Sequence, residues 1–168
     1  EINLGLDNDI FCFNVESAVE LEIINELAAT KNKVASIALR INPEVDAHTH
    51  AKITTGMKEN KFGINLSQLG GVLDKLKEMK NVKFIGLHFH IGSQILDMGD
   101  FVALCNRVNE LQDKLEAHRI RIEHINVGGG LGIDYKHPNR QAIPDFKDYF
   151  STYAEHLKLR SYQTLHFE

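Results

Sequence analysis

The chain has 168 residues, of which 43% are hydrophobic and 25% charged, a composition that can build one globular domain. Its formal net charge of -4 argues against a partner that is a nucleic acid or an anionic membrane surface. The apolar runs are far shorter than the roughly 20 residues that span a bilayer, and no signal-peptide pattern opens the chain. Two cysteines, Cys12 and Cys105, cannot form a disulfide framework, so we expect a soluble cytoplasmic protein.

Segments with the two-residue periodicity of strands alternate with segments of helical periodicity. The predicted strands cover residues 9–15, 34–42, 61–65, 82–91, 122–127 and 164–168. The predicted helices cover residues 18–29, 67–79, 100–118 and 144–159. Ser17 with Glu20 forms a capping box, Ser67 is the expected cap of the second helix, and Pro144 suits the first turn of the last helix. Alternating strands and helices predict parallel βαβ units.

The predicted strands carry apolar residues on one face and polar residues on the other. The polar face holds Asn14, Glu16, Arg40, Asn42, His88, His90, His124, Asn126, His166 and Glu168. A doubly wound sheet needs two apolar faces because helices cover both, so the pattern favours a (β/α)8 barrel with a polar interior. The alternative is a sheet with one face open to water. The last strand stops abruptly, so we expect one incomplete barrel domain over residues 1–168, truncated at both ends.

A run of glycines follows a predicted strand directly, at Gly128, Gly129 and Gly130. In a barrel the site lies at the carboxyl ends of the strands, where this run falls. Glycines let backbone amides approach an anion closely, which predicts a phosphate-binding loop. The alternative is a tight turn that needs positive φ angles. The spacing is not that of the dinucleotide fingerprint G-x-G-x-x-G.

Two histidines that share the polar face, His88 and His90, allow three interpretations. They could hold a metal, they could be hydrogen-bonded core residues, or His90 could stack on a planar cofactor while Ser93 donates to its phosphate. We favour the cofactor and expect no metal, because the other polar residues form no clear second ligand cluster. His48 and His50 lie on a long connection and are expected to be solvated.

Arg40 is predicted to point inward, so it needs an anionic partner. An ion pair with Glu16 or Glu168 and a role in the site are equally compatible with the sequence. Cys12 and Cys105 are expected to be small core residues, since neither has an obvious base beside it.

Five motifs together resemble the alanine-racemase-like, fold-type III pyridoxal-phosphate decarboxylases. They are Phe13-Asn14-Val15-Glu16-Ser17, Leu39-Arg40-Ile41-Asn42-Pro43, Lys61-Phe62-Gly63-Ile64, His88-Phe89-His90-Ile91-Gly92-Ser93-Gln94 and Asn126-Val127-Gly128-Gly129-Gly130-Leu131-Gly132. The resemblance covers essentially the whole chain. The forms Arg40-Ile41-Asn42-Pro43 and His90-Ile91-Gly92-Ser93-Gln94-Ile95 are more similar to the diaminopimelate branch than to the ornithine or arginine branches.

The resemblance implies pyridoxal 5'-phosphate as cofactor and His90 and Glu168 as catalytic residues. His90 would stack on the pyridine ring, and Glu168 would pair with the pyridinium nitrogen. Ser93 and the glycine run 128–130 would bind the phosphate, with Arg40 as a supporting residue. The implied reaction is decarboxylation of an amino acid, which in the diaminopimelate branch converts meso-diaminopimelate to L-lysine as the last step of lysine biosynthesis.

Some parts of the family pattern are missing from this sequence. The lysine to which the family attaches its cofactor belongs upstream of Glu1, and no lysine here matches it. The Gly-Arg expected after Glu168 and the C-terminal β domain, which supplies most of the family's dimer interface, are also missing. We therefore expect a homodimer for the full-length protein, and no activity and weak cofactor affinity for the isolated chain. Other substrates in the family, a non-catalytic cofactor-binding barrel and an H-x-H metallohydrolase are the alternatives.

Overall fold

The computed structural model describes residues 1–45, 62–133, 135, 137 and 145–168. In chain order the elements are α1 (Ile2–Asp7), β1 (Phe13–Val15), α2 (Ala18–Thr30), β2 (Ala35–Arg40), α3 (Leu66–Glu78), β3 (Val82–His88), α4 (Met98–Ala117), β4 (His124–Asn126), α5 (Phe146–His156) and β5 (Thr164–His166). None of the described helices is both long enough and apolar enough to cross a bilayer.

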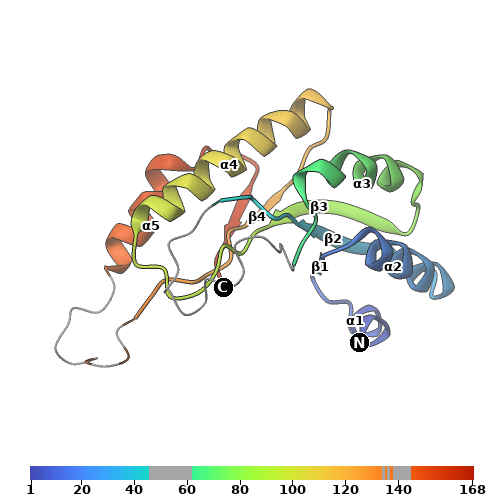
Figure 1. Ribbon diagram of the computed structural model, residues 1–168. Coiled ribbons are helices and arrows are strands. Elements are labelled where there is room, and N and C mark those ends of the chain that lie inside the picture. Colours follow the sequence, from blue (N-terminus) through green and yellow to red (C-terminus); the bar gives the residue numbers. More distant parts are fainter. Residues whose placement is uncertain (46–61, 134, 136, 138–144) are drawn as a thin grey trace.

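The strands of the described residues form one parallel sheet in the order β1-β2-β3-β4-β5, which is their order in the sequence (Figure 1). A doubly wound sheet reverses its strand order at a switch point, whereas a barrel adds each strand beside the previous one. With right-handed crossovers, this order places all connecting helices on the same face. The architecture therefore confirms the predicted partial (β/α) barrel.

The apolar face of the sheet is buried under the helices. The side chains of Val15, Ile37, Leu39, Ile125 and Val127 are fully buried and belong to one hydrophobic cluster that includes the apolar faces of α2, α4 and α5. On the other face the side chain of Asn14 is exposed, whereas those of Arg40, Asn126 and His166 are half-buried. The predicted division into an apolar outer face and a polar inner face is thus confirmed.

Several element boundaries differ from the prediction. The strand predicted over 82–91 ends at His88, so residues 89–95 leave the sheet. Ile64 forms a single parallel bridge with Ile41 instead of a strand over 61–65, of which Lys61 lies outside the described residues. Helix α1 was not predicted, because its six residues are too few to show a clear helical period.

The predicted N-cap residue is correct for α2 and wrong for α3. Ser17 caps α2 as expected, with its side chain accepting a hydrogen bond from the Glu20 amide at 3.1 Å. Helix α3 begins earlier than predicted, with Asn65 and not Ser67 as its N-cap residue. Asp145 caps α5 by accepting from the Asp148 amide at 3.1 Å, and the predicted opener Pro144 lies outside the described residues.

Strand β3 approaches β4 so closely at Gly86 that no side chain fits there. A Cβ atom at this position would lie 2.4 Å from the His124 carbonyl oxygen, well inside van der Waals contact. The register between β2 and β3 also shifts at Ile37 and Ala38, beside this contact. The glycine therefore allows the irregular strand pairing in the centre of the sheet.

We predict that Gly86→Ala lowers the free energy of unfolding by about 1–3 kcal/mol, because backbone atoms must move to admit the methyl group. Gly70→Ala is the matched control, since a Cβ there meets nothing within 4 Å and the residue lies inside α3. This control should raise the free energy by about 0.5–1 kcal/mol. Urea denaturation of the complete protein that contains this chain would measure both, and equal effects would contradict the prediction.

Asn109 joins the end of α5 to α4. Its side chain is 8% exposed, donates to the His156 carbonyl oxygen at 2.8 Å and accepts from the Lys158 amide at 2.8 Å. Both backbone groups lie where α5 ends and would have no helical partner. The single amide therefore satisfies the last turn of α5 and sets its position on α4.

We predict that Asn109→Ala destabilises the complete protein by about 1–3 kcal/mol, since two backbone groups lose their partners in a buried place. Asn106→Ala is the control, because Asn106 is an exposed residue on the same helix. Thermal and urea unfolding should show a loss for the first variant and almost none for the second. A loss shared by both variants would indicate an effect of helix propensity instead.

Candidate active site

The carboxyl ends of the strands meet at one edge of the sheet, and three segments extend from it. Residues 89–95 follow β3, residues 127–133 follow β4, and Glu168 lies just beyond β5. The first two segments run side by side, since the Ile95 amide donates to the Gly130 carbonyl oxygen at 2.9 Å and the Gly132 amide donates to the Ile95 carbonyl oxygen at 2.8 Å. This edge gathers the predicted site residues His90, Ser93, 128–130 and Glu168.

The glycine loop is held between two backbones. A Cβ at Gly128 would lie 2.4 Å from the Phe89 carbonyl oxygen, and one at Gly130 would lie 2.1 Å from the Gly92 carbonyl oxygen. On the other side, a Cβ at Gly129 would lie 2.5 Å from the carbonyl oxygen of Glu168. Gly128 and Gly130 also have positive φ angles, of 69° and 100°. The predicted turn with positive φ angles is therefore present, and the close contact with neighbouring backbone is a second reason for glycine here.

The loop offers backbone amides to a ligand. The Gly128 amide donates to Asn126 Oδ1 at 2.8 Å. Within the part of the chain that the structure describes, the amides of Gly129 and Gly130 donate no hydrogen bond. Buried amides are rarely left without a partner, and consecutive free amides form a nest for an anion. The geometry is suited to a phosphate group.

The segment after β3 borders this loop. His90 is half-buried, and its Nδ1 would lie 3.2 Å from a Cβ at Gly128, so the imidazole lies against the glycine loop. Ser93 is exposed on the same segment, next to Gly92 with its positive φ of 132°. The structure thus brings an aromatic ring, a hydroxyl group and free amides to one place.

Asn126 links the glycine loop to Glu168. Its Nδ2 donates to Glu168 Oε1 at 3.0 Å while its Oδ1 accepts from the Gly128 amide. The Glu168 amide in turn donates to the Gly128 carbonyl oxygen at 3.0 Å. The carboxylate and the loop are therefore positioned by one side chain. The sequence placed Asn126 on the polar face but assigned it no role; its position two residues before a glycine turn was the available signal.

His88 lies behind this carboxylate. The side chain is 5% exposed, and its Nε2 is 3.2 Å from Glu168 Oε1, although neither ring nitrogen has a hydrogen bond of good geometry within the described residues. Burial lowers the pKa of His88, and the nearby charges of Arg40 and His90 lower it further, against the opposing effect of Glu168. His88 is therefore a neutral imidazole near pH 7, in contact with the Glu168 carboxyl group.

Arg40 makes an ion pair with Glu16, with Nη1 2.5 Å from Oε1. Its guanidinium also lies over the ring of Phe62, 5.4 Å from the centroid. Of the two roles left open by the sequence, the ion pair is thus observed. The supporting role beside a cofactor stays a prediction, since only its neighbourhood to His88 points that way.

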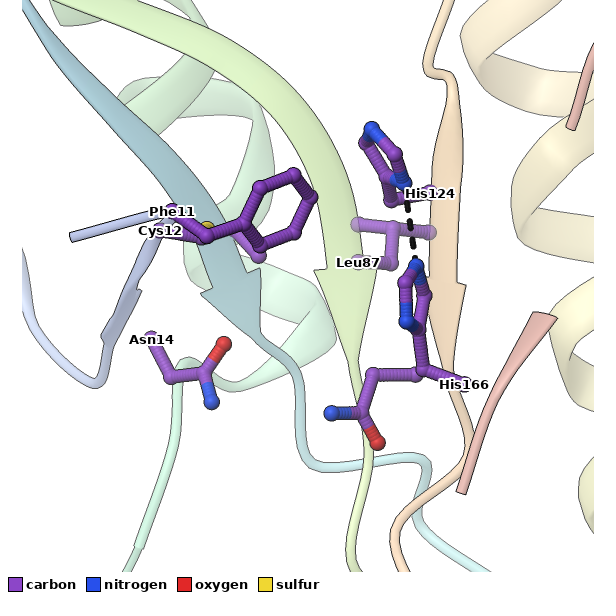
Figure 2. Close-up of a pocket in the computed structure, with 8 residues that line it drawn as sticks. Phe11, Cys12, Asn14, Leu87, His124 and His166 are labelled. Carbon is purple, nitrogen blue, oxygen red and sulfur yellow. Dashed lines mark hydrogen bonds between the residues drawn. The ribbon is translucent and has the colours of Figure 1, made fainter. Parts of the chain in front are cut away.

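A pocket of about 200 Å³ opens on the polar face of the sheet. Its lining residues lie on or next to the strands and not on the loops at their carboxyl ends. Figure 2 shows the rings of His124 and His166 on neighbouring strands, joined by a hydrogen bond of 3.0 Å, and Phe11 opposite them. Burial, together with the adjacent His166, lowers the pKa of His124. In this hydrogen bond one imidazole nitrogen donates and the other accepts.

The two cysteines are not activated. Cys12 lies at the pocket and Cys105 in the core, and burial raises their pKa values to about 11 and about 12. Both are therefore protonated thiols near neutral pH. Among the described residues no group of three or more histidine, cysteine or acidic side chains could hold a metal, so the H-x-H metal interpretation has no geometric support there. His48 and His50 lie outside the described residues.

Comparison with known proteins shows which family this chain belongs to. The family described as pyridoxal-dependent decarboxylase, pyridoxal binding domain, matches residues 1–166. The diaminopimelate decarboxylase of Bacteroides thetaiotaomicron is 76% identical over 168 residues, which are 100% of this chain and 44% of that protein. The chain thus spans less than half the length of this relative.

Solved structures are similar over the same extent. Diaminopimelate decarboxylase from Helicobacter pylori, complexed with L-lysine, has a TM-score of 0.87 at 33% identity and covers 100% of this chain and 42% of its own. The enzyme from M. jannaschii, in co-complex with L-lysine, has a TM-score of 0.81 at 36% identity, with 99% of this chain and 39% of its own covered. The family match over nearly every residue and these shared folds lead to one conclusion: the chain belongs to the pyridoxal-dependent decarboxylases and contributes to their pyridoxal-binding domain.

Proposed function

We propose that the complete protein containing this chain decarboxylates meso-diaminopimelate to L-lysine, the last step of lysine biosynthesis. The observation that carries this proposal is the 76% identity to a diaminopimelate decarboxylase over every residue of the chain. The matched region therefore includes all three segments that build the carboxyl edge. Two similar solved structures hold L-lysine, the product of this reaction.

The site fits pyridoxal 5'-phosphate. The amides of Gly129 and Gly130, which have no partner among the described residues, would hold the phosphate together with the Ser93 hydroxyl. The His90 ring beside the loop would pack on the pyridine ring. The carboxylate of Glu168 would face the ring nitrogen. When bound, the cofactor would supply an electron sink, which accepts the electron pair left on the substrate when carbon dioxide departs.

Residues of this chain would fix the direction of the Glu168 carboxylate and hold a proton on the ring nitrogen of the cofactor. Glu168, whose Oε1 accepts a hydrogen bond from Asn126, would keep a proton on the ring nitrogen of the cofactor. Asn126 prevents this carboxylate from turning away, because the same side chain is bound to the Gly128 amide. The neutral, buried His88 excludes water from the rear of the carboxylate without adding a competing positive charge.

Further properties of the whole protein follow from the same proposal. We infer a homodimer in the cytoplasm that binds an amino acid as its small-molecule substrate. The net charge of -4 and the unactivated cysteines are compatible with this environment. The lysine that carries the cofactor in this family would lie outside this chain, as would the C-terminal β domain.

The alternatives differ in what the complete protein would do. A relative in the same family would act on ornithine, arginine or carboxynorspermidine. A non-catalytic pyridoxal-phosphate barrel would bind the cofactor without releasing carbon dioxide, and a metallohydrolase would require a metal. No observation in the described residues favours these alternatives over the proposal.

We predict carbon dioxide release from meso-diaminopimelate, with equimolar L-lysine, by the product of the complete reading frame purified with pyridoxal phosphate. Ornithine, arginine and carboxynorspermidine, assayed side by side, should give at most background rates. The 168-residue chain alone should release none, since it contains no lysine matching the family's cofactor attachment site. Release from another substrate would overturn the proposed substrate, and no release from any would favour the non-catalytic alternative.

We predict that Glu168→Gln in the complete protein lowers kcat on the order of 100-fold while cofactor stoichiometry stays at one per subunit. The amide cannot stabilise a protonated ring nitrogen as the carboxylate does, so the electron sink is weakened. Glu155→Gln is the control, because Glu155 is exposed on α5. Steady-state kinetics with absorbance of the bound cofactor would measure this, and an unchanged kcat would remove Glu168 from the catalytic residues.

A further inference from the structure

Gln94 joins the two loops of the site through both ends of its side-chain amide. Its Oε1 accepts a hydrogen bond from the Ile133 amide at 3.1 Å, and its Nε2 donates to the Tyr135 hydroxyl at 3.3 Å. Ile133 and Tyr135 belong to the segment that continues directly from the glycine loop. The side chain therefore connects the loop that carries His90 and Ser93 with the loop that carries the free amides.

The backbone around Gln94 reinforces this connection. Ile95, the next residue, exchanges hydrogen bonds with Gly130 and Gly132, and it pairs with Leu131 in a parallel bridge. A Cβ at Gly132 would lie 3.0 Å from the carbonyl carbon of Gln94. The two loops are thus in contact along their length, and Gln94 fastens the end that is farther from the strands.

The backbone conformation of Gln94 is unusual for a residue with a side chain. Its φ of 61° lies in the left-handed region, where glycine is preferred. Glycine would adopt this angle without strain, as Gly92 does two residues earlier with its φ of 132°. A glutamine in this conformation is strained, and its two side-chain hydrogen bonds offset that strain.

We propose that Gln94 is a positioning residue for the phosphate of the cofactor. By holding Ile133 and Tyr135 against residues 91–95, it would keep the amides of Gly129 and Gly130 and the Ser93 hydroxyl positioned for the phosphate. Gln94 does not itself touch the cofactor in this arrangement. This inference rests on the proposed cofactor site, and it adds a residue whose contribution acts on the phosphate group alone.

Removal of the Gln94 side chain should therefore weaken the binding of the phosphate group without weakening the binding of the pyridine ring. Loss of the side chain leaves the pyridine ring with its contacts to His90 and Glu168, because these residues do not depend on the connection to Tyr135. It loosens only the loop amides and the hydroxyl that bind the phosphate. Pyridoxal, which lacks the phosphate, should therefore bind equally well with or without the Gln94 side chain.

The test uses the complete protein, freed of cofactor, with Gln94→Gly as the main variant. Glycine removes the side chain and also relieves the backbone strain, so the variant should fold at least as stably as the parent. We expect its Kd for pyridoxal phosphate to rise about tenfold, as for other residues that orient ligand-binding groups indirectly. Its Kd for pyridoxal should change less than twofold.

Two further variants separate the contacts. Gln94→Glu keeps an acceptor for the Ile133 amide, and its other oxygen can accept a hydrogen bond from the Tyr135 hydroxyl, so it should restore a large part of the affinity for pyridoxal phosphate. Tyr135→Phe removes only the contact at 3.3 Å and should raise this Kd less than Gln94→Gly does, because the contact with Ile133 remains. Spectroscopic titration with both ligands, together with the melting temperature of each variant, gives the readings.

The outcomes are distinct. A rise in the Kd for pyridoxal phosphate with an unchanged Kd for pyridoxal supports the proposal. An equal rise for both ligands, or no change for either, overturns it while the proposed function stands, because the parent protein still binds the cofactor. If the parent protein binds no pyridoxal phosphate, the proposed function itself fails, and the role of Gln94 falls with it.

Discussion

The close approach of two backbones at the carboxyl edge of the sheet is the constraint on which the site depends. Segment 127–133 lies so near to segment 89–95 that carbonyl oxygens occupy the places where Cβ atoms of Gly128 and Gly130 would be. Glycine is therefore required for packing before any ligand is considered. The same packing turns the next amides away from the strand ladder, and amides without a ladder partner become available to an anion.

The sheet supplies the second constraint, because its strands are covered on one face only. Strand order without reversal keeps every connecting helix on the apolar side, so the polar side is free to carry histidine, asparagine and acidic residues. Such residues in a doubly wound sheet would be buried under helices without partners. Here they find partners on the same face, as Arg40 does with Glu16 and Asn126 with Glu168.

Burial decides the charge of the histidine beside Glu168. His88 is almost fully buried, and desolvation lowers its pKa in spite of the carboxyl group beside it. Glu168 is about half exposed and accepts a hydrogen bond from Asn126. Because a neutral imidazole behind this carboxyl group adds no positive charge, it does not compete with a protonated pyridine ring on the open side of the site.

The sequence by itself determined the fold class, the alternation of elements and the family. Two-residue periodicity with one polar face was enough to predict a barrel, since a strand must place successive side chains on opposite faces. The motifs also predicted site roles for His90, Ser93, residues 128–130 and Glu168, and the fold brings these residues to one edge. Local signals failed for α3, where Asn65 competes with Ser67 as a cap, and for residues 89–91, which leave the sheet although they keep its alternation.

Only the tertiary structure decided how the site is held together. The links from Asn126 to Glu168 and from Gln94 to Ile133 join residues about forty positions apart, and no sequence pattern encodes which long-range partner a side-chain amide will find. The choice of Glu16 as the partner of Arg40 was likewise open until the strands were placed side by side. Periodicity reports the face on which a residue lies, whereas a hydrogen bond depends on distances between segments that only the packed fold brings together.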